Sequence, residues 1–201
     1  MTKKTEQAAR TRSSLVLAAA DNFDRHGYDG TSLASVCGAL GISMGALTFH
    51  FRSKAALAAA VADEGAAELQ HVRAAAPRTG RPLEDLSSLV QAVAVVLRES
   101  VRARSAARLI TEGQVHSAWP SDWRDEVEEL IGLAWDAGEL TEDIRPRAAA
   151  QLVRHLVEGV AVEARGTTGR PAPGAADFTE VWQAALTGLA AGPRPTTVGL
   201  P

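Results

Sequence analysis

The stretch TSLASVCGALGISMGALTFHF, residues 31–51, decides the fold. Its first half predicts a short helix that begins after the capping residues Thr31 and Ser32 and ends near Leu40. Apolar residues recur there at the three-to-four-residue spacing of a helix with one buried side: Leu33, Val36, Cys37 and Leu40. Gly41 stands where the chain must leave this helix, a position that often requires a positive φ.

A second helix is predicted directly after the turn. Ser43 can cap it, and Leu47 and Phe51, four residues apart, face the core. Four other residues remain for the outer face: Met44, Gly45, Thr48 and His50. Two short helices joined by a glycine-containing turn indicate a helix-turn-helix, whose second helix would lie in the major groove of DNA.

A longer helix precedes this unit. Residues 11–28, TRSSLVLAAADNFDRHGY, place Leu15, Val16, Ala19, Ala20 and Phe23 on one side. Gly27 ends the helix, and Tyr28 follows as its hydrophobic neighbour. Three helices then share one small core. Such a unit is too small to be very stable alone, so we expect it to be fused to a larger body.

The remaining chain predicts that body and an all-α fold of about nine helices. Alternating β-branched runs are missing from the 201 residues, of which 46% are hydrophobic and 22% charged. We expect a DNA-binding domain over 1–54, a helical ligand-binding and dimerisation domain over 55–191, and a disordered tail over 192–201. No apolar run suits a membrane span or a signal peptide, which predicts a cytoplasmic protein without a membrane partner.

Charge is unevenly distributed along the chain. Residues 1–54 hold seven Lys and Arg against four Asp and Glu, a net of +3, so the rest carries −6 of the total of −3. A basic head on an acidic body suits phosphate binding.

Within the body, a long helix capped by Ser53 is predicted up to Pro77, and residues 77–82 form a break. Residues 116–123, HSAWPSDW, are expected to form a loop that contains Trp119, which would cover the interior. Asp177 and Glu180 form a capping-box pattern at the start of the last helix.

The first 57 residues closely resemble the DNA-binding domain of TetR-family transcriptional regulators, through T-S-L, G-I-S-x-G-A-L-x-F-H-F and S-K-x-x-L. Three segments resemble the γ-butyrolactone receptors and pseudo-receptors of actinobacteria: the motif F-H-F, the segment before Trp123 and the stretch WDAGEL-x-x-D-I. This resemblance implies a homodimer, present as one or two dimers on a palindromic double-stranded DNA operator. It also implies a repressor that a small apolar ligand releases by tilting the helix after Ser53.

The resemblance implies DNA contacts for five residues that match the family pattern: Thr31, Ser43, Gly45, His50 and Lys54. Two positions depart from it, because the family often has Lys or Arg where Met44 stands and Tyr where Thr48 stands. Met44 could contact a thymine methyl group and Thr48 could donate one hydrogen bond, with Arg52 compensating electrostatically.

Ligand and dimer contacts follow from the same resemblance. Trp123 would line the ligand cavity, with a core anchor as the alternative. The other candidates for the cavity wall are Leu86, Val90, Val93, Leu109 and Gln114. Trp182 is expected at the dimer interface. The other residues expected there are Leu156, Val160, Val181 and Leu189.

Two other functional classes were weighed. An enzyme lacks support, because the sequence shows no Gly-rich phosphate loop, no G-x-S-x-G and no carboxylate pair with a matching base. A ligand- or partner-binding module of the same fold with weakened DNA reading remains open because of Met44 and Thr48. The histidines lack metal-ligand spacing, so neither metal nor cofactor is expected, and Cys37 is predicted to be a core residue rather than a redox switch.

Overall fold

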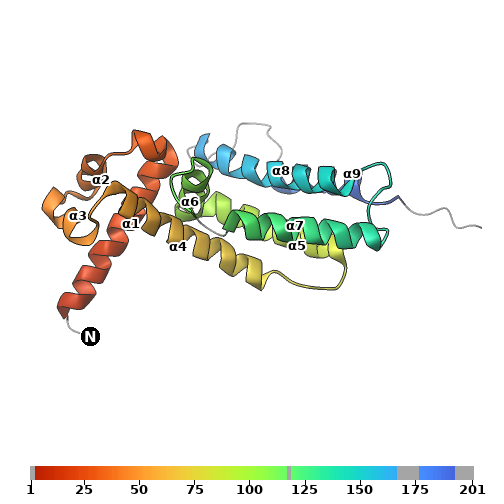
Figure 1. The fold of residues 1–201 in the computed structure, drawn as a ribbon, viewed down its shortest axis with the longest axis horizontal. Coiled ribbons are helices and arrows are strands. Elements are labelled where there is room, and N and C mark those ends of the chain that lie inside the picture. The colour runs from red at the N-terminus through yellow and green to blue at the C-terminus, as the bar shows by residue number, and fades with distance from the viewer. Residues whose placement is uncertain (1–2, 117–118, 167–176, 193–201) are drawn as a thin grey trace, which may run out of the picture.

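The computed structural model describes residues 3–116, 119–166 and 177–192. Within these ranges the chain folds into helices only, apart from one antiparallel bridge between Leu140 and Ala190, which confirms the all-α prediction. Figure 1 shows α1–α3 as a head at one end and α5, α7, α8 and α9 as an elongated body. The helices are α1 (Lys3–Gly30), α2 (Leu33–Leu40), α3 (Met44–His50), α4 (Lys54–Ala75), α5 (Pro82–Glu99), α6 (Val101–Thr111), α7 (Trp119–Asp136), α8 (Pro146–Gly166) and α9 (Phe178–Leu189).

Local chemistry sets most helix ends. Ser43 and Ser53 cap α3 and α4 by accepting hydrogen bonds from backbone N–H groups three residues on, as predicted. Asp177 and Glu180 form the predicted capping box of α9. Gly41 ends α2 in the left-handed conformation, with φ 64° and ψ 31°. These ends therefore follow from short-range pairs of residues that the sequence displays directly.

The core consists of two clusters of buried side chains. The head cluster joins α1, α2 and α3 to the first half of α4, where Leu57 and Val61 are fully buried. The body cluster contains the second half of α4 together with α5, α7, α8 and α9. Because α4 contributes to both clusters, a movement of this helix displaces head and body together.

Helix α6 lies between the head and the body in Figure 1 and packs against α1 and α4. Its Leu109 is fully buried in the head cluster, so the prediction that Leu109 lines a ligand cavity of the body is wrong. Where α4 crosses α6, a Cβ atom on Gly65 would lie 2.2 Å from the carbonyl oxygen of Arg102. This glycine permits a close approach of the two helix backbones.

Two sequence-based expectations for the body are corrected. Helix α7 begins at Trp119, within the segment expected to be a loop, since proline at residue 120 is compatible with a first helical turn. Trp182 is fully buried within its own chain, where its Nε1 donates to Ser87 Oγ at 2.9 Å. Its side chain is therefore not exposed to a second protomer, contrary to the prediction. The expected disordered tail lies outside the described residues, except for its first residue.

The segment before α5 is held by Asp85. Its carboxylate accepts hydrogen bonds from the backbone N–H of Thr79 at 2.6 Å, the hydroxyl of Thr79 at 2.8 Å and the backbone N–H of Gly80 at 3.3 Å. The N–H of Thr79 lowers the pKa of Asp85 most; burial opposes this, and the other two hydrogen bonds again lower the pKa.

A folded-state pKa below the unfolded one means that ionised Asp85 stabilises the fold at neutral pH, and that this stabilisation is lost as acid protonates it below about pH 4. We expect Asp85→Asn to lower the free energy of unfolding at pH 7. The difference in free energy of unfolding between the variant and the wild type should become smaller below pH 4. Urea unfolding at several pH values measures both. A gap that does not depend on pH would contradict an electrostatic role.

Among the described residues, no single helix is long and apolar enough to cross a membrane; only the sharply bent pair of α2 and α3 reaches that length and hydropathy together.

Candidate DNA-binding surface

Helices α2 and α3 are arranged as a helix-turn-helix. Their axes are bent by 108° relative to each other, and only residues 41–43 separate them. Both values match the motif, in which a turn of three or four residues joins helices at about 90–120°. Leu47 and Phe51 hold α3 against α1 and α2 through the head cluster. The opposite side of α3 is thereby presented to solvent at the far end of the head (Figure 1).

The exposed side of α3 includes a residue that the sequence analysis missed. Met44, Gly45 and Thr48 are exposed as predicted, but Phe49 is 80% exposed, more than Met44 at 43%. Phe49 lies two residues from each of the buried Leu47 and Phe51, which is about 200° around the helix. This spacing places Phe49 on the outer face and is the signal in the sequence from which Phe49 could have been found.

His50 is less available than predicted. It is half-buried at the end of α3, and its ring lies edge-on to the ring of Phe49 with centroids 5.1 Å apart. The hydroxyl of Thr48 donates to the carbonyl of Gly45 at 3.2 Å, so this donor is used within the helix.

The prediction that Thr31 contacts phosphate is corrected. Its side chain is buried, and its hydroxyl donates to the carbonyl of Gly27 at 2.8 Å. Ser32 instead caps α2, in a reciprocal pair with Ser35. The reason is that α1 is kinked at Gly27, which has a φ of 70°, and the carbonyl at this kink accepts a hydrogen bond from the Thr31 hydroxyl.

Lys54 has a role inside the head that was not foreseen. Its Nζ donates to the carbonyls of Tyr28 and Thr31 at 2.9 and 3.0 Å and lies 4.1 Å from the centroid of the Tyr28 ring. Two of its three donors therefore tie the start of α4 to the end of α1, and one remains for a phosphate.

Other cations of the head differ in their availability. Arg12 pairs with Glu64 at 3.5 Å and Arg25 with Asp21 at 3.0 Å. Arg52 is exposed directly after α3 and forms no ion pair with the described residues. Arg52 is thus the cation best placed beside α3 for a phosphate contact.

The residues expected to line a ligand cavity divide into two groups. Trp123 and three aliphatic residues lie together in the body cluster: Leu86, Val90 and Val93. Leu109 belongs to the head cluster, and Gln114 is exposed beyond α6, where its backbone N–H donates to Leu109. The prediction is therefore wrong for Leu109 and Gln114, because helical periodicity does not reveal which element covers a residue.

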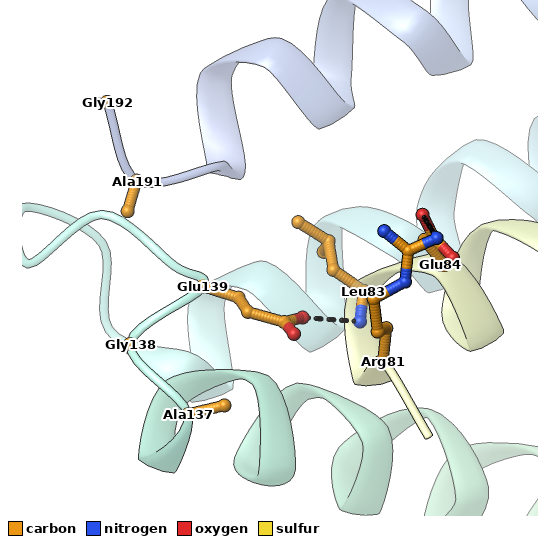
Figure 2. Close-up of a pocket in the computed structure, with 8 residues that line it drawn as sticks. All are labelled: Arg81, Leu83, Glu84, Ala137, Gly138, Glu139, Ala191 and Gly192. Carbon is orange, nitrogen blue, oxygen red and sulfur yellow. Dashed lines mark hydrogen bonds and ion pairs between the residues drawn. The ribbon is translucent and has the colours of Figure 1, made fainter. Parts of the chain in front are cut away.

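Two hollows on the body lie away from Trp123. One, of about 480 Å³, opens between the start of α5, the end of α7 and the end of α9 (Figure 2). Its Glu139 is already engaged, since Oε2 accepts the backbone N–H of Leu83 at 2.8 Å. The other, of about 400 Å³, lies beside Ile131 and Arg147. Neither hollow reaches the side chains predicted to bind a ligand.

The residues predicted for a dimer interface are likewise only partly at the surface. Val181 on α9 is exposed and Leu156 on α8 is half-buried, whereas Val160 and Leu189 are buried in the body cluster together with Trp182. Helix α8 also exposes Leu152 and Val162, the latter by 60%. These exposed side chains, rather than the buried three, form the apolar surface of α8 and α9.

A buried ionic cluster joins the head to the body. Asp24 on α1 is 3% exposed; its Oδ2 accepts from Arg104 Nε on α6 at 2.9 Å, and its Oδ1 lies 3.8 Å from Nη1 of Arg165 on α8. Arg108 donates to the Asp24 carbonyl at 2.7 Å and also pairs with Glu112. Burial lowers the pKa of Arg165, and the nearby Asp24 carboxylate opposes this effect.

Within the described ranges, no three His, Cys, Asp or Glu side chains gather closely enough to hold a metal ion. Cys37 is a free thiol buried in the head cluster, as predicted.

Comparisons with known proteins agree with this geometry. Residues 15–61 match the family model of bacterial regulatory proteins, tetR family. The A-factor receptor protein of Streptomyces griseus is 30% identical over 190 residues, which cover 93% of this chain and 66% of that protein. The chain thus spans slightly less than two thirds of this relative.

Solved structures are similar over nearly the whole chain. CprB, a TetR-family protein from Streptomyces coelicolor A3(2), is 27% identical with a TM-score of 0.76, covering 94% of this chain and 92% of that one. A gamma-butyrolactone receptor is 25% identical with a TM-score of 0.71, covering 92% and 90%. The relatives found are transcriptional regulators rather than enzymes. From its helix-turn-helix and these likenesses, the chain carries a DNA-binding domain of the tetR family of bacterial regulatory proteins in residues 15–61.

Proposed function

We propose that the protein is a cytoplasmic transcriptional repressor that binds a palindromic operator as a homodimer and is released by a small apolar ligand of the γ-butyrolactone type. The observation that carries this proposal is the exposed face of α3, held at the end of a basic head by a helix-turn-helix. Residues 1–54 would bind DNA, and residues 55–191 would bind the ligand and the second protomer.

The similar proteins support the DNA-binding and ligand-binding parts of the proposal. CprB has been solved in complex with its biological operator sequence, and this structure is 26% identical to the chain with a TM-score of 0.71. The gamma-butyrolactone receptor is named for the lactone class of its ligand, and the A-factor receptor protein is named for A-factor. The exposed apolar side chains of α8 and α9 give a second protomer a surface to cover: Leu152, Val162 and Val181.

Ligand entry requires rearrangement of the body. Trp123, Val90 and Val93 are packed in the core, so a ligand beside them must separate α5 and α7. Because the second half of α4 lies in the same cluster, this separation would displace α4 and, with it, the head. A ligand that binds the separated form more tightly therefore shifts the protein from the DNA-binding form.

The test starts with the purified full-length chain and a selection from random duplexes, alongside its own upstream DNA. A palindromic site that binds with strong salt dependence, and that a synthetic γ-butyrolactone with an alkyl tail releases, is the expected result. Specific binding that no such lactone releases would overturn the ligand class. Failure to select any sequence would favour a module with weakened DNA reading, consistent with the buried Thr31 hydroxyl.

Arg52 provides a quantitative check on the orientation of the head. We expect Arg52→Ala to weaken binding of all duplexes by a similar factor and to reduce the slope of log affinity against log salt by about 2, because each of the two protomers loses one phosphate contact. Arg147→Ala, which removes an exposed arginine from α8, should leave both quantities unchanged. An unchanged slope in Arg52→Ala would place the phosphates elsewhere.

A further inference from the structure

The reading face of α3, defined here as Met44, Gly45, Thr48 and Phe49, is almost entirely apolar. The helix contains no Lys, Arg, Asn, Gln, Asp or Glu, which are the side chains that commonly form bidentate hydrogen bonds to base edges. Its two polar side chains are limited, because Thr48 donates to Gly45 within the helix and His50 is half-buried. The side chains of α3 therefore offer few hydrogen-bond donors and acceptors to base edges.

Apolar contact is the remaining chemistry of this face. Phe49, near the C-terminal end of α3, lies on the side opposite the buried Leu47, and Met44 is exposed at the first position of the same helix. In a helix that enters the major groove, side chains exposed on the outer face lie against base edges. The thymine C5-methyl is the apolar group that standard base pairs present in that groove.

We infer that Phe49 and Met44 read thymine methyl groups, so that the operator half-site contains thymines at the positions facing α3. This inference rests on the proposed function, since it specifies the DNA sequence class that the same site recognises. Gly45 supports it, because no side chain at that position separates the helix from the bases, and a Cβ there would meet only Ser43 Oγ at 3.9 Å.

The experiment removes single methyl groups from the DNA. In the duplex obtained by selection, each thymine of one half-site is replaced in turn by deoxyuridine, which differs only by the C5-methyl. We expect about a fourfold loss of affinity at one or two positions, the amount that burial of one methyl group contributes. Phe49→Ala should bind the unmodified duplex more weakly and should no longer distinguish thymine from deoxyuridine at its position.

Matched variants make the outcomes separable. Leu133→Ala truncates an exposed apolar side chain on α7, away from the head, and should retain the full sensitivity to deoxyuridine. If every substitution leaves wild-type affinity unchanged although the selected duplex binds specifically, the inference is overturned while the proposed function stands. Equal sensitivity in wild type, Phe49→Ala and Met44→Ala would also overturn it. If no duplex is selected at all, the proposed function fails first.

Discussion

Gly65→Ala is expected to destabilise the protein by about 1–3 kcal/mol or more, although alanine is the better helix former. The added Cβ would lie 2.2 Å from the carbonyl oxygen of Arg102 and 2.6 Å from the Cβ of Ala106. Backbone and Cβ atoms cannot rotate out of the way as the end of a flexible side chain can. The variant must therefore separate α4 from α6, which also disturbs the cluster on each side of the crossing.

Urea unfolding of the wild type and Gly65→Ala measures this effect through the shift of the midpoint. Gly132→Ala on α7 is the matched control, because its Cβ would meet nothing within 4 Å. That control should be neutral or stabilised by up to about 1 kcal/mol from helix propensity alone. A stability of Gly65→Ala equal to that of Gly132→Ala would show that α4 and α6 are less closely apposed than in this structure.

The DNA-reading unit could be predicted from the sequence because its determinants are local. Gly41 and Ser43 set the turn through conformations and hydrogen bonds within four residues, and the period of Leu47 and Phe51 orients α3. The same period places Phe49 on the outer face, although the sequence analysis did not include Phe49 there.

The incorrect predictions concern residues whose surroundings depend on which element of the fold covers them. Trp182 and Leu109 both lie on apolar helix sides, as predicted, but the first is covered by its own body and the second by the head. Thr31 was expected to face solvent, whereas the kink at Gly27 turns its hydroxyl inward. A helical period shows that a side is buried and leaves open what buries it.

Asp24→Ala is expected to lower the free energy of unfolding by about 1–3 kcal/mol, because it leaves partly buried guanidinium groups without their counter-charge. Arg104 is bound at 2.9 Å and Arg165 lies at 3.8 Å, on two different helices of the chain. Asp21→Ala is the matched control on the same helix, since its pair with Arg25 is exposed. That substitution should change stability by no more than about 1 kcal/mol.

A double-mutant cycle separates the ionic contact from other effects of truncating Asp24. Arg104→Ala alone should also destabilise, whereas the double variant should be more stable than the sum of the single losses predicts, because no charge is then left unpaired at that contact. Strict additivity would contradict the pairing. Since the cluster ties α1 to α6 and α8, Asp24→Ala should also loosen the head relative to the body, measurable as faster amide exchange in α1 than in Asp21→Ala.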